Sequence, residues 1–168
     1  PKLEVLELSG NELTGTIPTF GYQPALYFVS LYDNDLSGTI PESIVGLPGL
    51  LFVDLRDNRL VGSIPSLLGQ LPELVTFFAQ NNQLTGSLPS FSGNKGLLQA
   101  LNLSRNRLSG DLNSFFGSTG PVTRLSSVDL GQNNFVGTIP TMIENFSALT
   151  ELTLQDNSLS GTIPIEIR

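Results

Sequence analysis

Four aspartates in two neighbouring stretches of the chain are the side chains best suited to chemistry. They are Asp33, Asp35, Asp54 and Asp57. Paired carboxylates could act as the acid and base of a glycoside hydrolase, or as oxygen ligands for calcium. Arg56 and Arg59 lie in the second stretch, however, and solvated acids offset by these arginines are the simpler interpretation.

The rest of the composition adds no common catalytic group. The 168 residues include no histidine and no cysteine, which removes the commonest general base, the thiol nucleophile and the usual transition-metal ligands. The glycines recur at regular intervals and do not cluster before a helix, so no phosphate-binding loop is expected. We therefore expect no enzyme activity, no cofactor and no metal site.

One sequence unit, repeated seven times, must position these residues. Its clearest copy is LLFVDLRDNRL, from Leu50 to Leu60. With the first leucine as position zero, the copies start near residues 3, 26, 50, 74, 98, 125 and 149. A period of roughly 20 to 50 residues is typical of solenoids and other repeat arrays. We therefore expect one elongated domain.

Position eight of the unit is asparagine in every copy. The seven residues are Asn11, Asn34, Asn58, Asn82, Asn106, Asn133 and Asn157. An inward-facing amide can pair backbone groups where the chain turns away from a strand. We interpret these residues as an internal structural ladder and not as a binding site. Loss of one should leave buried backbone groups unsatisfied, at about 1 to 3 kcal/mol each.

The other repeated positions predict the remaining elements. Positions three and five are apolar in all copies, an alternation typical of a half-buried strand, and stacked copies would form a parallel sheet. Position twelve is glycine, and Ile-Pro or Leu-Pro ends a second short extended run in six of the copies. Apolar residues three apart then favour short 3₁₀ or irregular turns. The fifth copy is longer, and its GSTGP stretch, from Gly117 to Pro121, is either a tolerated loop or a bulge that contacts a partner.

The pattern LxxLxLxxNxLxGxIPxxLxxL resembles the plant-type leucine-rich repeat over essentially all of the chain. The resemblance implies a leucine-rich-repeat solenoid over residues 1–168, a right-handed superhelix. It would have a parallel concave β-sheet with one strand per repeat, a short second sheet, and a convex face of 3₁₀ and irregular turns. Such proteins usually carry caps that cover their apolar ends, often paired by cysteines. The absence of either cap leads us to expect a segment of a longer array.

The resemblance also implies recognition. Members include receptor-like kinase and receptor-like protein ectodomains and polygalacturonase inhibitors, which bind peptides, steroids, co-receptors or other proteins. We therefore expect a non-catalytic extracellular or cell-surface module that binds a peptide, protein or glycan on its concave face, as in a receptor ectodomain, and that could meet a co-receptor. Two sequons, at Asn102 and Asn145, are candidate N-glycosylation sites of such a glycoprotein.

The outward positions two, four and six of repeats two to four form the candidate ligand-binding face. With the acids beside them, the residues are Phe28, Ser30, Tyr32, Asp33, Phe52, Asp54, Arg56, Asp57, Phe78 and Gln80. Aromatic and arginine anchors are favoured in interfaces, although aromatic neighbours can also simply stiffen a sheet. If the face binds, Phe52→Ala and Arg56→Ala should weaken binding without lowering the Tm. The sheet offers about 500 Å², which suits a peptide, an oligosaccharide or one end of a larger footprint.

The net charge and the hydropathy of the chain argue against some classes of partner. The net charge of −7 and the pI of about 4.3 disfavour nucleic acid and anionic membrane surfaces. No apolar run reaches the roughly 18 residues of a membrane span, so no membrane insertion by this segment is expected.

Two alternative functions stay open. Hydroxyl residues recur at position thirteen, in a row made of Thr16, Thr39, Ser63, Ser87, Asp111, Thr138 and Thr162. Regular hydroxyl rows resemble the faces of ice-binding solenoids, although such residues are also ordinary on an exposed strand. The chain could instead be a freestanding inhibitor of a secreted hydrolase.

Overall fold

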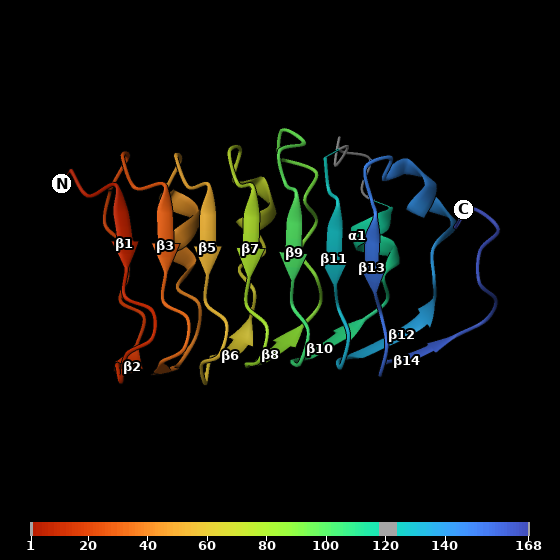
Figure 1. Ribbon diagram of the computed structural model, residues 1–168, viewed down its shortest axis with the longest axis horizontal. Helices are drawn as coiled ribbons and strands as arrows, with labels where there is room; N and C mark the ends of the chain where they lie inside the picture. Colours follow the sequence, from red (N-terminus) through yellow and green to blue (C-terminus); the bar gives the residue numbers. More distant parts are fainter. Residues whose placement is uncertain (1, 118–123, 168) are drawn as a thin grey trace.

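A computed structural model describes residues 2–117 and 124–167. In this part of the chain, one strand from each repeat joins a seven-stranded parallel sheet whose strands follow chain order (Figure 1). These strands are β1 (Val5–Glu7), β3 (Phe28–Ser30), β5 (Phe52–Asp54), β7 (Thr76–Phe78), β9 (Ala100–Asn102), β11 (Ser127–Asp129) and β13 (Glu151–Thr153). The sheet predicted from the repeated positions is confirmed.

The alternation of apolar and variable positions explains how each strand lies. The middle residue of a strand is position three, and Val53, Phe77 and Leu101 are fully or almost fully buried there. Positions two and four flank it and face the other way, onto the side that we call the concave face. Because the strands pair in register, as Phe28 does with Phe52, equivalent positions of neighbouring repeats stand side by side.

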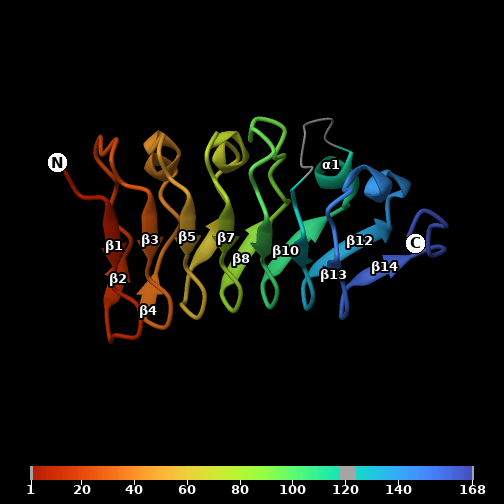
Figure 2. The same ribbon diagram turned by 45° about the horizontal axis from the view of Figure 1, so that its top comes forward.

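A second layer of short strands follows the concave sheet along its lower edge in Figure 1, and Figure 2 shows it from a tilted view. The sequence predicts one short second sheet, whereas the described residues form two. β2 (Thr14–Thr16) pairs with β4 (Asp35–Ser37), while β6 (Val61–Ser63), β8 (Gln83–Gly86), β10 (Arg107–Gly110), β12 (Asn134–Thr138) and β14 (Ser158–Ser160) form a five-stranded sheet. The break between the two sheets lies between β4 and β6. β4 ends at position eleven of its repeat, whereas β6 begins at position eleven of its own repeat.

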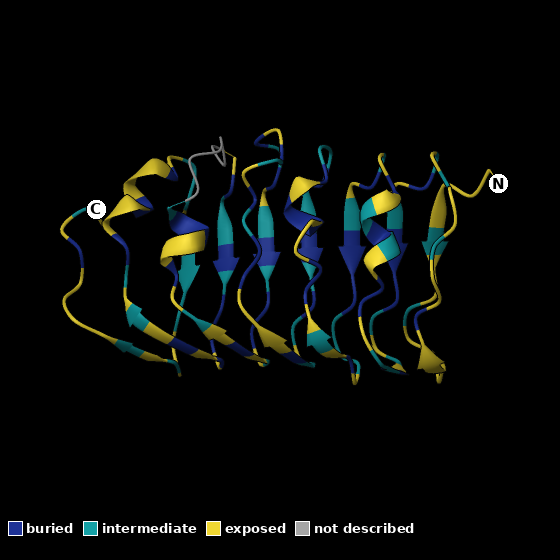
Figure 3. Ribbon diagram, turned by 180° about the vertical axis from the view of Figure 1, so that it is seen from behind, coloured by how far each residue is buried: buried dark blue, intermediate teal, exposed yellow. Residues whose placement is uncertain are grey.

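Short helices cover the side opposite the concave face (Figure 3). They are the 3₁₀ helices η1 (Glu42–Gly46), η2 (Leu68–Gln70) and η3 (Thr141–Asn145), and one α-helix, α1 (Asn113–Phe116). The α-helix occurs in the repeat that lacks the usual proline, where Asn113 follows Leu112. Its buried Phe115 and Phe116 both pack against Phe146. Of the longer connection predicted in this repeat, residues 118–121 lie outside the described residues.

The position-eight asparagines join each repeat to the one before it. The side-chain amide of Asn82 donates to the carbonyl oxygens of Leu55 (3.0 Å) and Ala79 (3.2 Å), and its Oδ1 accepts the N–H of Leu60 (2.8 Å). Leu55 and Leu60 belong to the preceding repeat. The same links recur at Asn34, Asn58, Asn106, Asn133 and Asn157. Each amide therefore satisfies backbone groups that no strand can pair.

The residue before each asparagine, at position seven, is left-handed in all repeats. The residues are Gly10, Asp33, Asp57, Asn81, Arg105, Gln132 and Asp156, with φ between 54° and 63°. Asparagine, aspartate and glycine tolerate this conformation better than most residues. The reversal turns the chain sharply at the end of each concave strand, and so sets the position-seven side chains along the rim of the concave face.

Asn82→Ala should lower the free energy of unfolding by about 1 to 3 kcal/mol or more, because at least the Leu60 N–H loses its partner in a part-buried place. Asn11→Ala is the matched control. Asn11 is exposed and donates to Leu8 and Ser9 of its own repeat, so a smaller loss is expected. Chemical denaturation of both variants measures the difference. Equal losses would mean that the links between repeats add nothing.

Candidate ligand-binding face

Three phenylalanines form an aromatic patch on the concave face. Phe28 and Phe52 stack with their ring centroids 4.5 Å apart and an interplanar angle of 3°, while Phe52 meets Phe78 edge to face at 6.2 Å. They lie on the adjacent strands β3, β5 and β7, and each is half-buried. Neighbouring strands therefore bring together the rings that the sequence places in one patch. The contacts stiffen the sheet and still leave part of each ring open to solvent.

Arg56 is held beside this patch by two contacts. Its guanidinium carbon lies 4.2 Å from the centroid of the Tyr32 ring, and its Nε lies 3.4 Å from the Asp54 carboxylate. A cation over an aromatic face is attracted by the ring quadrupole. One third of the Arg56 side chain stays exposed, so a fixed planar donor group is presented at the edge of the aromatic patch.

Two of the predicted binding residues are covered. Ser30 and Asp54 occupy position four, on the concave side of the sheet, but they are only 1% and 2% exposed. Asp54 accepts the backbone N–H of Arg56 (3.2 Å). Burial raises the pKa of the Asp54 carboxyl above its ordinary value, against the lowering effects of the Arg56 hydrogen bond and charge. Neither residue offers surface to a partner, and Asp54 is better described as the support of Arg56.

The four aspartates do not gather into one site. Asp35 belongs to β4 in the second layer, where it pairs with Arg59 at 2.8 Å. Asp33 is exposed at the rim, and Asp57 accepts a hydrogen bond from Asn81 (2.6 Å). In residues 2–117 and 124–167, no three acidic side chains lie close enough together to hold a metal ion.

A polar pocket of about 250 Å³ continues the concave face toward the C-terminus. It is lined by Asp57, Gln80, Asn81, Ser104, Arg105, Asp129, Gln132 and Gln155. Ser104 is the small position-six residue that lines it, and Gly131, at position six of the next repeat, leaves room for the Gln155 side chain. A Cβ atom at Gly131 would come within 2.5 Å of the Gln155 amide. Of the residues that line the pocket, only Asp57 and Gln80 are among those predicted from the sequence, although the Gln-Ser-Gly-Gln order at position six is visible there.

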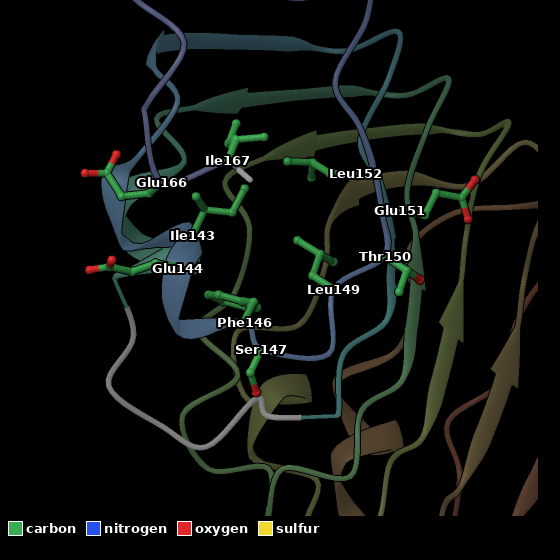
Figure 4. A pocket seen from close by; sticks show the side chains of 10 residues that line it. All are labelled: Ile143, Glu144, Phe146, Ser147, Leu149, Thr150, Glu151, Leu152, Glu166 and Ile167. Carbon is green, nitrogen blue, oxygen red and sulfur yellow. The ribbon is translucent and has the colours of Figure 1, made fainter.

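A different hollow, of about 450 Å³, lies at the C-terminal end of the repeat array (Figure 4). Apolar side chains such as Ile143, Leu149 and Ile167 point into it, whereas the carboxylates of Glu144 and Glu166 point away. The apolar part of the hollow therefore continues the apolar core.

The two sequons lie on opposite sides of the molecule. Asn102 is in β9 on the concave face, where its Oδ1 accepts hydrogen bonds from the backbone (3.0 Å) and hydroxyl (2.8 Å) of Ser104. Asn145 is exposed at the end of η3. A glycan on Asn102 would stand over the candidate binding face, whereas one on Asn145 would leave that face open.

The comparison with known protein families agrees with the structural repeat seen in the asparagine hydrogen bonds. The Leucine Rich Repeat family model matches residues 2–21, 49–71, 97–119, 124–146 and 148–168. The chain belongs to the leucine-rich repeat family. The family resemblance and the solenoid fold predicted from the sequence are thereby confirmed. No curated protein sequence matches this leucine-rich repeat chain.

Several solved structures are similar to this leucine-rich repeat protein. The plant peptide hormone receptor RGFR1, solved in complex with RGF2, is 40% identical with a TM-score of 0.93, over 99% of this chain and 26% of that one. The Arabidopsis receptor kinase HAESA, solved with the peptide hormone IDA and the co-receptor SERK1, is 33% identical with a TM-score of 0.80, over 96% and 27%. A plant ice-binding protein is 25% identical with a TM-score of 0.55, over 96% and 67%.

The leucine-rich repeat segment spans about a quarter of the length of each of the two receptors. In the part of the chain that the structure describes, no helix combines the length and the apolar character that a membrane crossing requires.

Asp54→Asn tests whether the covered carboxylate costs stability. Because burial raises its pKa in the folded state, folding is penalised while the group is ionised, and the penalty disappears as pH falls through the raised value. The unfolding free energy of the wild type relative to Asp54→Asn should therefore rise between neutral pH and about pH 4. Denaturation across this range measures it.

Asp33→Asn removes the same charge from an exposed position, and so controls for net charge. A wild type that loses stability relative to Asp54→Asn as the pH falls would contradict the burial argument.

Proposed function

We propose that this chain is a non-catalytic recognition module of an extracellular receptor-like ectodomain, and that it binds a peptide, protein or glycan on its concave face. It would form part of a longer leucine-rich repeat array, with any co-receptor as a second partner. The aromatic patch is the observation that carries the proposal. Its rings stay partly exposed beside a fixed arginine, and aromatic and arginine side chains are the anchors that interfaces favour.

The similar receptors support a peptide as the first partner to test. RGFR1 was solved with RGF2, and HAESA with a peptide hormone and a co-receptor. This segment covers only about a quarter of either receptor. Its own ligand is therefore inferred from its own face, where a strip of roughly 500 Å² matches an extended peptide better than a globular partner.

The packing changes how the face should be tested. Phe52 packs against two other rings, and Arg56 compensates the covered carboxylate of Asp54. Phe52→Ala and Arg56→Ala should thus lower the Tm as well as weaken binding, unlike the expectation from sequence. A side chain added to the face gives a cleaner test than one removed from the core of the patch.

Ala100→Arg supplies such a test. Ala100 lies in β9 between Thr76 and Ser127 of the neighbouring strands, so a long side chain would extend over the concave face. Peptides selected from a displayed random library by the wild-type protein should bind this variant about tenfold or more weakly. Ser109→Arg adds the same group to β10 in the second layer, where Ser109 is exposed, and should leave binding unchanged.

Biolayer interferometry on the purified variants would measure the effect. Selected peptides that bind Ala100→Arg as tightly as the wild type would place the binding surface elsewhere, and the proposal would fail.

Ice binding remains the second candidate, because two observations favour it. The position-thirteen residues, such as Thr16, Thr39 and Thr138, are exposed in all seven repeats, and a plant ice-binding protein has a similar fold. Against it, the charged Asp111 interrupts the position-thirteen row. Val61 and Val136 interrupt the neighbouring row of hydroxyl residues at position eleven, which is made of Thr14, Ser37, Thr85, Ser109 and Ser160.

We expect no thermal hysteresis at millimolar protein, because these interruptions break the regular array of hydroxyl groups. A nanolitre osmometer measures it directly. Hysteresis that is lost in Thr138→Lys but kept in Ala100→Arg would assign the function to the second layer instead.

A further inference from the structure

Most of the net negative charge of the protein lies on one face. The concave positions two, four and six, with the rim position seven, carry seven acids and two arginines. They are Glu7, Asp33, Asp54, Asp57, Asp129, Glu151, Asp156, Arg56 and Arg105. Five of the seven net negative charges are thus on this face and its rim. A surface of one sign attracts and orients oppositely charged partners.

The charges of this face are poorly compensated within the protein. Elsewhere Arg59 pairs with Asp35 at 2.8 Å and Lys95 pairs with Glu73 at 2.6 Å. Among the described residues of the concave face and its rim, the only ion pair joins Arg56 to Asp54. The other acids accept at most local hydrogen bonds, so an incoming cation would meet carboxylates that have no counterion.

The polar pocket, on the same face as the aromatic patch, also favours a cationic group. It is lined by two acids, Asp57 and Asp129, and by one base, Arg105, which is exposed. In the described part of the chain, the buried Oε1 of Gln80 has no hydrogen-bond partner. Asp129 uses one oxygen for the N–H of Gly131 (3.0 Å). With two carboxylates and one guanidinium, the pocket carries a net negative charge, and its carboxylates suit an ammonium or guanidinium group.

The distance between the aromatic patch and the polar pocket determines how long a peptide must be to reach both. Strands lie about 4.8 Å apart, and residues advance about 3.3 Å along an extended chain. Ser104, which lines the pocket, lies two strands beyond Phe52 and four positions further along its repeat, which makes the distance about 16 Å. An extended peptide that runs obliquely across the strands would cover this distance in about five residues.

We propose that the concave face takes an extended peptide that sets an apolar or aromatic residue on the aromatic patch and a lysine or arginine, about five residues away, in the polar pocket. This inference rests on the proposed function and adds the chemistry of the partner. An uncharged glycan could donate hydrogen bonds to the unpaired acids but would leave their charge uncompensated, and an acidic peptide would be repelled by them.

The sequences of the peptides selected by the wild-type protein test it. Among peptides that bind Ala100→Arg weakly and Ser109→Arg normally, basic residues should be enriched over acidic ones at the stated distance from an apolar residue. The double variant Asp57→Asn, Asp129→Asn should weaken their binding about tenfold, and raised salt should weaken wild-type binding. Both asparagines keep the Oδ1 acceptor used by Asn81 and Gly131, so folding should be retained.

Arg105→Gln is the matched control, because it removes the one basic side chain of the same pocket. It should leave the binding of the basic peptides equal or tighter. Concave-face peptides enriched in acidic residues, and weakened by Arg105→Gln, would overturn this inference while the proposed function stands. Concave-face peptides without any charge preference would do the same. Failure to recover peptides sensitive to Ala100→Arg would overturn both.

Discussion

The hydrogen bonds of the position-eight asparagine are the interaction on which the rest of this structure depends. Each concave strand has only three residues, and the backbone pairing between repeats continues from it as far as position eight, where the Asn34 N–H donates to the carbonyl oxygen of Asp57 (3.2 Å). The asparagine lies where the chain leaves the strand, and at Asn82 its amide joins a carbonyl and an N–H of the preceding repeat, from Leu55 and Leu60. This link fixes the register of neighbouring turns. Because the register is fixed, equal positions stand side by side, and a patch such as Phe28, Phe52 and Phe78 can form from residues about 24 positions apart in the sequence.

Most features that recur in every repeat could be predicted from sequence, whereas several features that occur once could not. The glycine at position twelve marks an unusual dihedral angle, and all seven of these glycines have positive φ, as at Gly62 (77°). By contrast, nothing in the repeat pattern indicates that Asn94 is buried and bonds four backbone groups with its amide. The same holds for the short helix at Asn113–Phe116. Single-repeat features depend on the packing of the particular neighbours, and one copy gives no pattern to detect.

The candidate ligand-binding face likewise has features that could be predicted from sequence and features that could not. The rings of Phe28, Phe52 and Phe78 could be placed together because they occupy positions two and four of consecutive repeats. The burial of Ser30 and Asp54 could not be foreseen, because the repeat pattern gives the side of the sheet on which a position-four residue lies and not how far its neighbours cover it. The pocket was missed for a different reason, because the order Gln80, Ser104, Gly131 and Gln155 at position six is visible in the sequence but does not by itself show a pocket. Periodicity predicts which way a side chain points, whereas exposure depends on the sizes and rotamers of its neighbours.

Asp54 joins the framework to the face, and it shows how stability and recognition compete there. A carboxylate that is 2% exposed carries a desolvation cost, and a neutral residue at position four would avoid it. The carboxylate holds Arg56, however, and Tyr32 holds the same guanidinium from its ring face. An arginine that is already ordered loses less side-chain entropy when a partner arrives. The cost in folding free energy would thus be recovered on binding, which favours an arginine kept for a ligand over one that merely balances charge.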